Sequence, residues 1–314
     1  MTTLASKRHL WFAISLIVIV PGLISLVLFG VRLGIDFTGG TAWEIAFDRS
    51  TDSETVLGVL EGQGYTGSTV QRVGNSDATY LIRMKEVTEG SPEKAALAAA
   101  LTQEVAPFVE REFSTVGASV GEAIRNRAIF AVLLASIGIV SYMAFAFRNT
   151  QNPLLYGLCA LVAMLHDVLV VVGIFSILGE FADVEVGALF VTALLTVIGF
   201  SVHDTIVVFD RIRENLAGRA DSSFEEIVNY SLAQTLVRSM NTSLVVVFTL
   251  LALYLFGGST TREFVLALLI GVVSGTYSSV FNASQLLVAW EKGEIQRIFG
   301  RLRGRRRPEP APIG

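Results

Sequence analysis

The chain has 314 residues, 52% of them hydrophobic and only 17% charged, whereas a soluble domain carries about a quarter charged residues. Apolar runs of about 20 residues, long enough to cross about 30 Å of hydrocarbon, alternate with polar stretches. The net charge of −4 argues against nucleic acid as a partner, and the single cysteine, Cys159, excludes a disulfide within the chain. The composition therefore indicates a polytopic α-helical membrane protein.

The first apolar run covers residues 10–29 and follows Lys7 and Arg8. A basic start before an apolar run is typical of a secretory signal peptide. This run is too long for a signal peptide, and no small-x-small cleavage site closes it. We therefore interpret it as a retained first transmembrane helix, preceded by a short N-terminus of residues 1–9.

Residues 30–127 form a polar region between the first and second spans, large enough for a small folded domain. Ser91 and Pro92 are expected to cap and open a helix in it. Apolar periodicity and turn residues predict, in order, a strand at 41–47, a helix at 53–63, strands at 68–73 and 79–84 joined by a turn at 74–77, a helix at 91–113 and a strand at 114–120. The order βαββαβ predicts a ferredoxin-like α+β domain, a fold that specifies no function by itself.

Five more apolar runs bring the number of predicted transmembrane helices to six. They lie at residues 128–147, 154–178, 187–209, 237–256 and 264–290, so that residues 128–290 form the main membrane domain. Residues 291–314 form a basic tail. We expect the tail either to lie near anionic lipid or to contact a ribosome or a partner protein.

Basic residues near the span ends predict the orientation of the chain. One side of the membrane carries Lys7, Arg8, Arg148, Arg211, Arg213, Arg219, Lys292, Arg297, Arg301, Arg303, Arg305, Arg306 and Arg307. The short loops on the opposite side carry Arg262 alone, and the loop at 179–186 is acidic. The positive-inside rule therefore places both termini in the cytoplasm and the polar domain on the extracytoplasmic side.

Asp204 lies inside the fourth span, about 17 residues and roughly 25 Å past Gly187. An ionisable residue within hydrocarbon is a functional candidate by default. A desolvated carboxyl suits reversible proton binding; the alternative is a structural carboxylate that is hydrogen-bonded to a neighbouring helix. Arg238 is the expected partner, because the fifth span must begin near Val237 to reach about 20 residues. Alternatively, Arg238 only extends to the membrane surface.

Other polar or small residues in the spans extend this candidate site. His166 and Asp167 are expected either to carry protons or to form a fixed hydrogen-bond network between helices. His203 points about 100° away from Asp204 on a helix, so it need not share the same site. A polar seam is predicted at Asn241, Thr242 and Asn282, and close helix packing at Gly271 and Gly275.

Motifs for catalysis, for phosphate binding and for metal binding are not found in the sequence. We therefore expect a protein that is not an enzyme and that holds no cofactor and no metal. Gly39 and Gly40 do not indicate a nucleotide site, because the lysine and the strand-to-helix context of such a site are missing.

Several motifs resemble those of the SecD/SecF family of bacterial protein-export membrane proteins, part of the resistance-nodulation-division superfamily. They are GIDFTGGT at 34–41, VGASVG at 116–121, HD at 166–167, SVHDTIVVFDRIREN at 201–215, TLVRS at 235–239 and LYLFGG at 253–258. The first motif includes Asp36, Gly39 and Gly40. The external region of about 100 residues and the DRIREN run resemble the SecF branch, because SecD members have a larger external domain.

The resemblance implies a subunit that pairs with SecD in the bacterial cytoplasmic membrane. The pair is expected to associate with the SecYEG channel, with YajC as a further candidate partner, and to pull on an emerging preprotein by using the proton motive force. Asp204 and Arg238 match the aspartate and arginine that the family implicates in proton passage, which favours H⁺ over Na⁺. Many members carry Asn at the position of His203, so this histidine could tune Asp204.

Two alternative functions remain at this point. One is half of a small-molecule or lipid exporter of the same superfamily, although such exporters usually have twelve spans in one chain. The other is a translocon scaffold without an energy source.

Overall fold

The computed structural model describes residues 4–73, 77–150, 152–219, 222–258, 261–294 and 297. Gly74, Asn75 and Ser76 of the expected turn lie outside the described residues, as does the expected basic tail after Arg297.

Six helical segments among the described residues are long and apolar enough to cross a membrane, which confirms the predicted number. They are α1 (Arg8–Leu28, after the short turn Ala5–Lys7), α5 (Ala118–Ala146), α6 (Pro153–Ala182), α7 (Ala188–Gly218), α8 (Phe224–Phe256) and a last segment made of α9 (Arg262–Ser278), a π-helical turn (Ser279–Ala283) and α10 (Ser284–Glu291). Several helices extend beyond the predicted spans because their polar ends are also helical. For example, α8 begins behind a capping box formed by Ser223 and Glu226.

The region between α1 and α5 folds into the predicted α+β domain. Its elements are β1 (Gly40–Phe47), α3 (Ser53–Gly62), β2 (Thr69–Arg72), β3 (Thr79–Met84), α4 (Pro92–Glu104) and β4 (Phe108–Val116). The strand order is β2-β3-β1-β4 and the neighbouring strands are antiparallel, as in a split βαβ fold. Trp43, Ile45, Tyr80 and Ile82 of the two central strands are buried in its core.

The predictions of a helix through residue 113 and of a strand at 114–120 are wrong. α4 ends at Glu104, and β4 covers Phe108–Val116. Pro107 accounts for the difference, because proline has no N–H to donate and disfavours a helical conformation at the residue before it. The start of α4 is as predicted: Pro92 is its first residue, and the Ser91 side chain accepts a hydrogen bond from the backbone N–H of Lys94.

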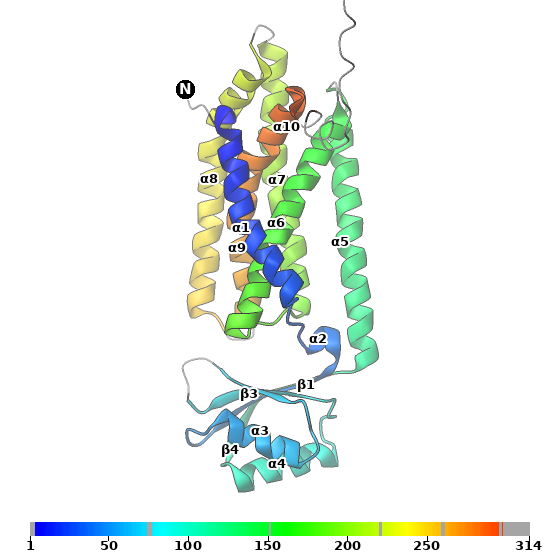
Figure 1. Cartoon of the computed structure of the whole chain (residues 1–314), viewed down its shortest axis with the longest axis vertical. Coiled ribbons are helices and arrows are strands. Elements are labelled where there is room, and N and C mark those ends of the chain that lie inside the picture. The colour runs from blue at the N-terminus through cyan, green and yellow to red at the C-terminus, as the bar shows by residue number, and fades with distance from the viewer. Residues whose placement is uncertain are drawn as a thin grey trace, which may run out of the picture.

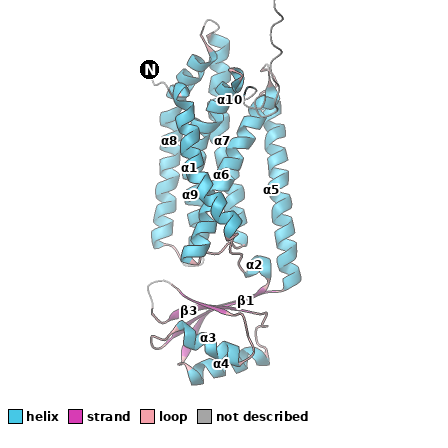
Figure 2. Ribbon diagram, viewed as in Figure 1, coloured by secondary structure: helices cyan, strands magenta, loops and turns pink. Residues whose placement is uncertain are grey.

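The external domain lies at one end of the helix bundle, and the N-terminus and α10 lie at the other end (Figure 1). In the part of the chain that the structure describes, strands occur only in this external domain (Figure 2). The domain joins the bundle through two adjacent connections. One runs from α1 through the short helix α2 (Ile35–Thr38) into β1, and the other runs from β4 into α5. This arrangement agrees with a domain on one side of the membrane and the N-terminus on the other.

Candidate functional site

Asp204 lies inside the bundle at the contact between α7 and α8, with only 5% of its surface exposed. Its Oδ1 atom accepts a hydrogen bond from the Ser239 hydroxyl of α8 at 3.3 Å. Its Oδ2 atom is buried and has no hydrogen-bond partner among the described residues. An ionised carboxylate with one unsatisfied oxygen is unfavourable in such surroundings, and binding a proton removes the charge.

The expected pair between Asp204 and Arg238 is not among the ion pairs of the described residues. Arg238 is exposed in this chain, whereas the next residue, Ser239, is buried and contacts Asp204. Adjacent residues differ by about 100° around a helix axis. The inward face of α8 carries Thr235, Ser239 and Ser243, so Arg238 lies on a different face.

Asp167 of α6 forms the second buried carboxylate site. Its Oδ2 atom accepts hydrogen bonds from Ser201 of α7 and Ser278 of α9, both at 2.6 Å. Its Oδ1 atom accepts one from Ser274 of α9 at 2.7 Å and lies 3.0 Å from His166 Nδ1. These partners provide hydrogen bonds for both carboxyl oxygens and connect α6, α7 and α9 through one side chain.

His166 connects this network to the first and last spans. Its Nε2 atom lies 3.1 Å from the Ser15 hydroxyl of α1. Ser15 also exchanges hydrogen bonds with the Asn282 side-chain amide, and Asn282 belongs to the π-helical turn Ser279–Ala283. Such turns shift the side chains that follow and are frequent at functional sites. His166, Asp167 and Asn282 therefore belong to one buried polar cluster.

Besides Arg238, three predicted residues lie outside both carboxylate sites. His203, Asn241 and Thr242 are exposed in this chain, and the Thr242 hydroxyl donates to the Arg238 carbonyl of its own helix. Together with Arg238, Asn241 and Thr242 leave a polar face of α8 uncovered within a membrane-spanning helix.

Gly271 and Gly275 lie where α9 packs against α7. A Cβ atom added at Gly275 would lie 3.0 Å from the Cβ atom of Ser201, and one added at Gly271 would overlap Val197. The absence of side chains at these glycines lets the two helices approach closely. This approach brings the α9 serines to Asp167.

The motif after the first span binds the two domain connections together. Gly39 has a φ of +75°, and a Cβ atom there would lie 2.7 Å from Ala118 Cα at the start of α5. A Cβ atom on Gly40, with a φ of +120°, would lie 2.8 Å from the Met84 carbonyl oxygen. Both the backbone conformation and the available space therefore require glycine. Asp36 contacts the start of α7, where its Oδ2 atom accepts a hydrogen bond from the Ala188 N–H.

The external domain also contacts the α6–α7 loop through an ion pair. The Nε atom of Arg83, in β3, lies 2.8 Å from Oε2 of Glu185, and both side chains are mostly buried. Burial raises the pKa of Glu185 from an ordinary 4.5 to about 7, against the opposing attraction of Arg83. Glu263 of α9 and Arg32, which follows α1, are the other charged groups that act on Glu185.

Comparisons with known proteins agree with these motifs. The family model described as "Protein export membrane protein SecD/SecF, C-terminal" matches residues 97–293, more than half of the chain. The chain belongs to the SecD/SecF family. A second model, "SecD/SecF GG Motif", matches residues 24–50 and so includes the Gly39–Gly40 connection of this family.

Relatives within the SecD/SecF family cover nearly the whole chain. The protein translocase subunit SecF of Thermobaculum terrenum is 58% identical over 94% of this chain and 95% of its own length. The SecF of Anaerolinea thermophila is 43% identical over 96% of this chain and 98% of its own length. The crystal structure of SecDF from Thermus thermophilus, described as a translocon-associated membrane protein, superposes with a TM-score of 0.80 at 33% identity. It covers 92% of this chain and 38% of the longer SecDF chain.

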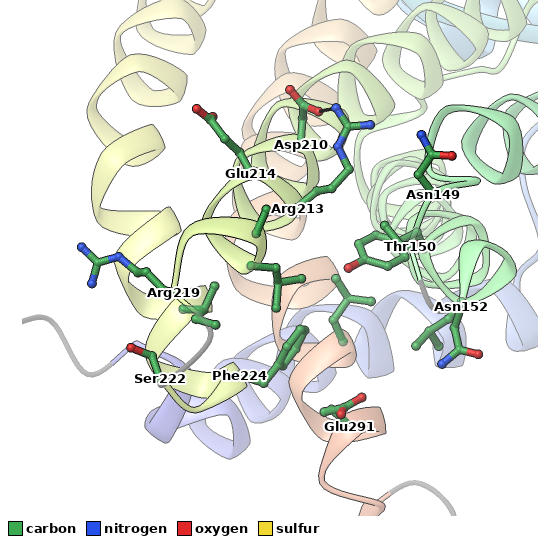
Figure 3. A pocket seen from close by; sticks show the side chains of 16 residues that line it. Asn149, Thr150, Asn152, Asp210, Arg213, Glu214, Arg219, Ser222, Phe224 and Glu291 are labelled. Carbon is green, nitrogen blue, oxygen red and sulfur yellow. Dashed lines mark ion pairs between the residues drawn. The ribbon is translucent and has the colours of Figure 1, made fainter.

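An open hollow of about 890 Å³ lies at the end of the bundle that is opposite to the Gly39–Gly40 connection. It is lined by the α5–α6 loop, α7, the start of α8 and the end of α10. Figure 3 shows the ion pair between Asp210 and Arg213 in its wall, with the Nη2 and Oδ1 atoms 2.5 Å apart. Asp210 lies six residues after Asp204 on α7, about 9 Å along the helix axis. The hollow gives water access to the same helix that carries Asp204.

Buried serines complete the site, and of these the sequence indicated only Ser239, as part of a polar end of the fifth span. Ser15, Ser201, Ser239, Ser274 and Ser278 supply most of the hydrogen bonds to Asp204, Asp167 and His166. The sequence around Ser239 contained a usable signal. Thr235, Ser239 and Ser243 recur every four residues, which places small polar side chains on one face of α8.

Proposed function

We propose that this chain is a SecF-type subunit of a bacterial protein translocase, which with a SecD-type partner uses the proton motive force to assist preprotein export. The proposal rests chiefly on Asp204, a buried carboxylate with one oxygen that lacks a hydrogen-bond partner within the described part of the chain. The names of the SecF relatives and the length of the match support the translocase assignment.

Proton binding at Asp204 would act through the contact between α7 and α8. A neutral carboxyl no longer needs donors for both oxygens and can itself donate, so protonation changes which packing of these two helices is favourable. A proton that crosses 100 mV supplies about 2.3 kcal/mol, enough to bias two packings of similar energy.

The uncovered face of α8 is the candidate contact for the SecD-type partner. Arg238, Asn241 and Thr242 would be unfavourable in lipid and need polar neighbours. The family includes SecDF chains, such as that of Bacillus subtilis, in which we take the SecD and SecF parts to be joined. This chain is 36% identical to the Bacillus subtilis protein and matches 38% of the length of that protein. In the proposed assembly, Arg238 is covered by the partner. SecYEG, the preprotein and YajC are the further candidate partners.

The test is a reconstitution of this chain with a SecD-type partner, SecYEG, a motor ATPase and a preprotein in sealed vesicles. We expect an imposed proton gradient to increase the yield of completed export, and a protonophore to abolish the increase. A Na⁺ gradient of equal size should have no effect. Export that is insensitive to both gradients would leave only a scaffold role.

A further inference from the structure

The external domain is tied to the start of α7, the same helix that carries Asp204. Residues 183–187 form the loop between α6 and α7. The backbone N–H of Gly34 donates to the Val186 carbonyl at 2.9 Å, and the N–H of Val186 donates to the Arg32 carbonyl at 2.8 Å. The segment that leaves α1 therefore pairs with this loop before it enters α2.

Asp36 makes the closest contact to the helix itself. Its Oδ2 atom lies 2.6 Å from the backbone nitrogen of Ala188, the first residue of α7. The N-cap residue of α7 is Gly187, which has no side chain with which to cap the helix. A Cβ atom on Gly187 would lie 2.9 Å from Asp36 Oδ2, so the glycine leaves the space that the carboxylate occupies. Asp36 thus supplies a cap from a distant segment, with a charge that suits a helix N-terminus.

The neighbours of Asp36 anchor it on both sides. Phe37 is buried in an apolar cluster with Phe175 of α6 and Phe190 of α7. A Cβ atom on Gly121, in the first turn of α5, would lie 3.1 Å from the Phe37 carbonyl oxygen. β1 begins at Gly40, so only a few residues separate the α7 contact from the sheet of the external domain.

We propose that Asp36 is a positioning residue for proton-coupled export: by capping the N-terminus of α7, its carboxylate transmits movement of the helix that carries Asp204 to the external domain. This inference rests on the proposed function. From Ala188 to Asp204, α7 is continuous helix, about 24 Å of nearly rigid rod. A displacement of α7 at Asp204 therefore displaces the helix N-terminus at the Asp36 contact by a similar amount.

The test compares Asp36→Ala with Asp36→Asn in the vesicle system, and measures proton transfer and completed export separately. An Ala variant loses the acceptor, whereas Asn keeps an oxygen that can cap. We expect Asp36→Ala to reduce export per proton transferred by about fivefold, the factor that corresponds to a lost helix cap. Asp36→Asn should retain most of the coupling. Asp52→Ala is the matched control, because Asp52 is the N-cap residue of α3 and makes no side-chain cap there.

A second variant keeps the test decisive if Asp36→Ala does not fold. Gly187→Ala retains the Asp36 charge but places a methyl group where the carboxylate lies, and its φ of −102° suits alanine. Spin labels on α3 and on the C-terminal end of α8 report how the external domain moves. In the unmodified protein the label distance should change with the proton gradient. In Gly187→Ala it should no longer follow the gradient.

Three outcomes would overturn the inference: normal coupling in Asp36→Ala, normal coupling in Gly187→Ala, or an equal loss of coupling in Asp36→Ala and Asp36→Asn. An Asp204→Asn variant that exports normally would instead contradict the proposed function, whatever the Asp36 variants do. The two failures are therefore distinguishable in one set of measurements.

Discussion

Two carboxylates are buried within one bundle, yet their surroundings differ in a way that separates their roles. Asp167 has hydrogen-bond partners at both oxygens, from α6, α7 and α9. Asp204 has one partner at 3.3 Å and one oxygen without a partner among the described residues. Ser201 donates to Asp167 and lies less than one turn before Asp204 on α7, so the two sites are neighbours.

The difference shows that burial alone does not identify a proton carrier. A carboxylate that accepts several hydrogen bonds is stable in its ionised form, and its partners are then part of the structure. A carboxylate with an unsatisfied oxygen can exchange its charge for a proton at a smaller loss of hydrogen bonds. We therefore expect reversible protonation at Asp204 and a fixed hydrogen-bond network at Asp167.

The largest expected effect is that of Asp204→Asn on export. The amide cannot exchange a proton, so stimulation by the proton gradient should fall to the level of vesicles without this chain. Membrane insertion and thermal stability should be unchanged or slightly improved, because the neutral amide removes a charge that is costly to bury. Completed export and the melting temperature are the two measurements.

Asp210→Asn is the control for this prediction. It removes a carboxylate from the same helix, but Asp210 is exposed and paired with Arg213 at the surface. Export should stay near the unmodified level. Normal export in Asp204→Asn, or an equal loss in both variants, would remove the distinction between a buried carrier and an ordinary helix carboxylate.

The next largest effect should be that of Asp167→Ala on stability. Removal of the carboxylate leaves the hydroxyls of Ser201, Ser274 and Ser278 without their acceptor, which should destabilise the protein by about 3 kcal/mol. A lowered melting temperature in detergent is the expected result. Asp167→Asn should have a smaller effect, because the amide retains an acceptor and the hydroxyls can reorient. If the melting temperature stays the same while export is lost, Asp167 is a carrier too.

A milder perturbation of the Asp167 site is Gly275→Ala. The added methyl group would press against Ser201, whose hydroxyl donates to Asp167, so a loss of about 1 kcal/mol is expected. Gly199→Ala is the matched control on α7, because a Cβ atom there meets nothing within 4 Å. The control should be neutral or slightly more stable, since alanine favours helix. The melting temperature of Gly275→Ala should therefore fall, whereas that of Gly199→Ala should stay the same or rise slightly.

The smallest expected effect concerns Glu185, a third carboxylate, which is mostly buried and forms an ion pair with Arg83. Its pKa of about 7 when docked against Arg83, compared with an ordinary 4.5, means that the docked form holds a proton between these values that the free form has lost. Docking of the external domain should therefore be tightest below about pH 4.5. It should weaken as the pH rises to about 7 and stay constant above that.

Glu185→Gln should remove the contribution of Glu185 to this pH dependence and leave docking at pH 8 at least as tight as in the unmodified protein. The docked fraction follows from the distance between labels on α3 and α8, measured from pH 4.5 to 8. Glu61→Gln, on the exposed face of α3, is the control and should keep the original pH profile. A pH profile in Glu185→Gln that matches the unmodified protein would assign the titration to another group.

The sequence predicted the parts of this molecule that depend on local pattern. Apolar length predicted six spans, period-two alternation predicted β1, and the Ser91–Pro92 pair predicted the start of α4. It also indicated Asp204, because a charge inside an apolar run is visible without a fold. It did not predict that Ser239 rather than Arg238 faces Asp204, because packing between helices sets the rotation of a helix about its axis. Pro107 was a readable stop signal that the prediction overlooked.

The uncovered polar face of α8 has a consequence for the life of the chain before assembly. A newly made copy without its partner presents a guanidinium and an amide from a segment that crosses the bilayer. An unassembled copy is therefore less stable in the bilayer, and chaperones and proteases remove marginally stable proteins faster. Cellular levels of this chain should consequently follow the supply of its partner, so that stoichiometry is set by turnover as well as by synthesis.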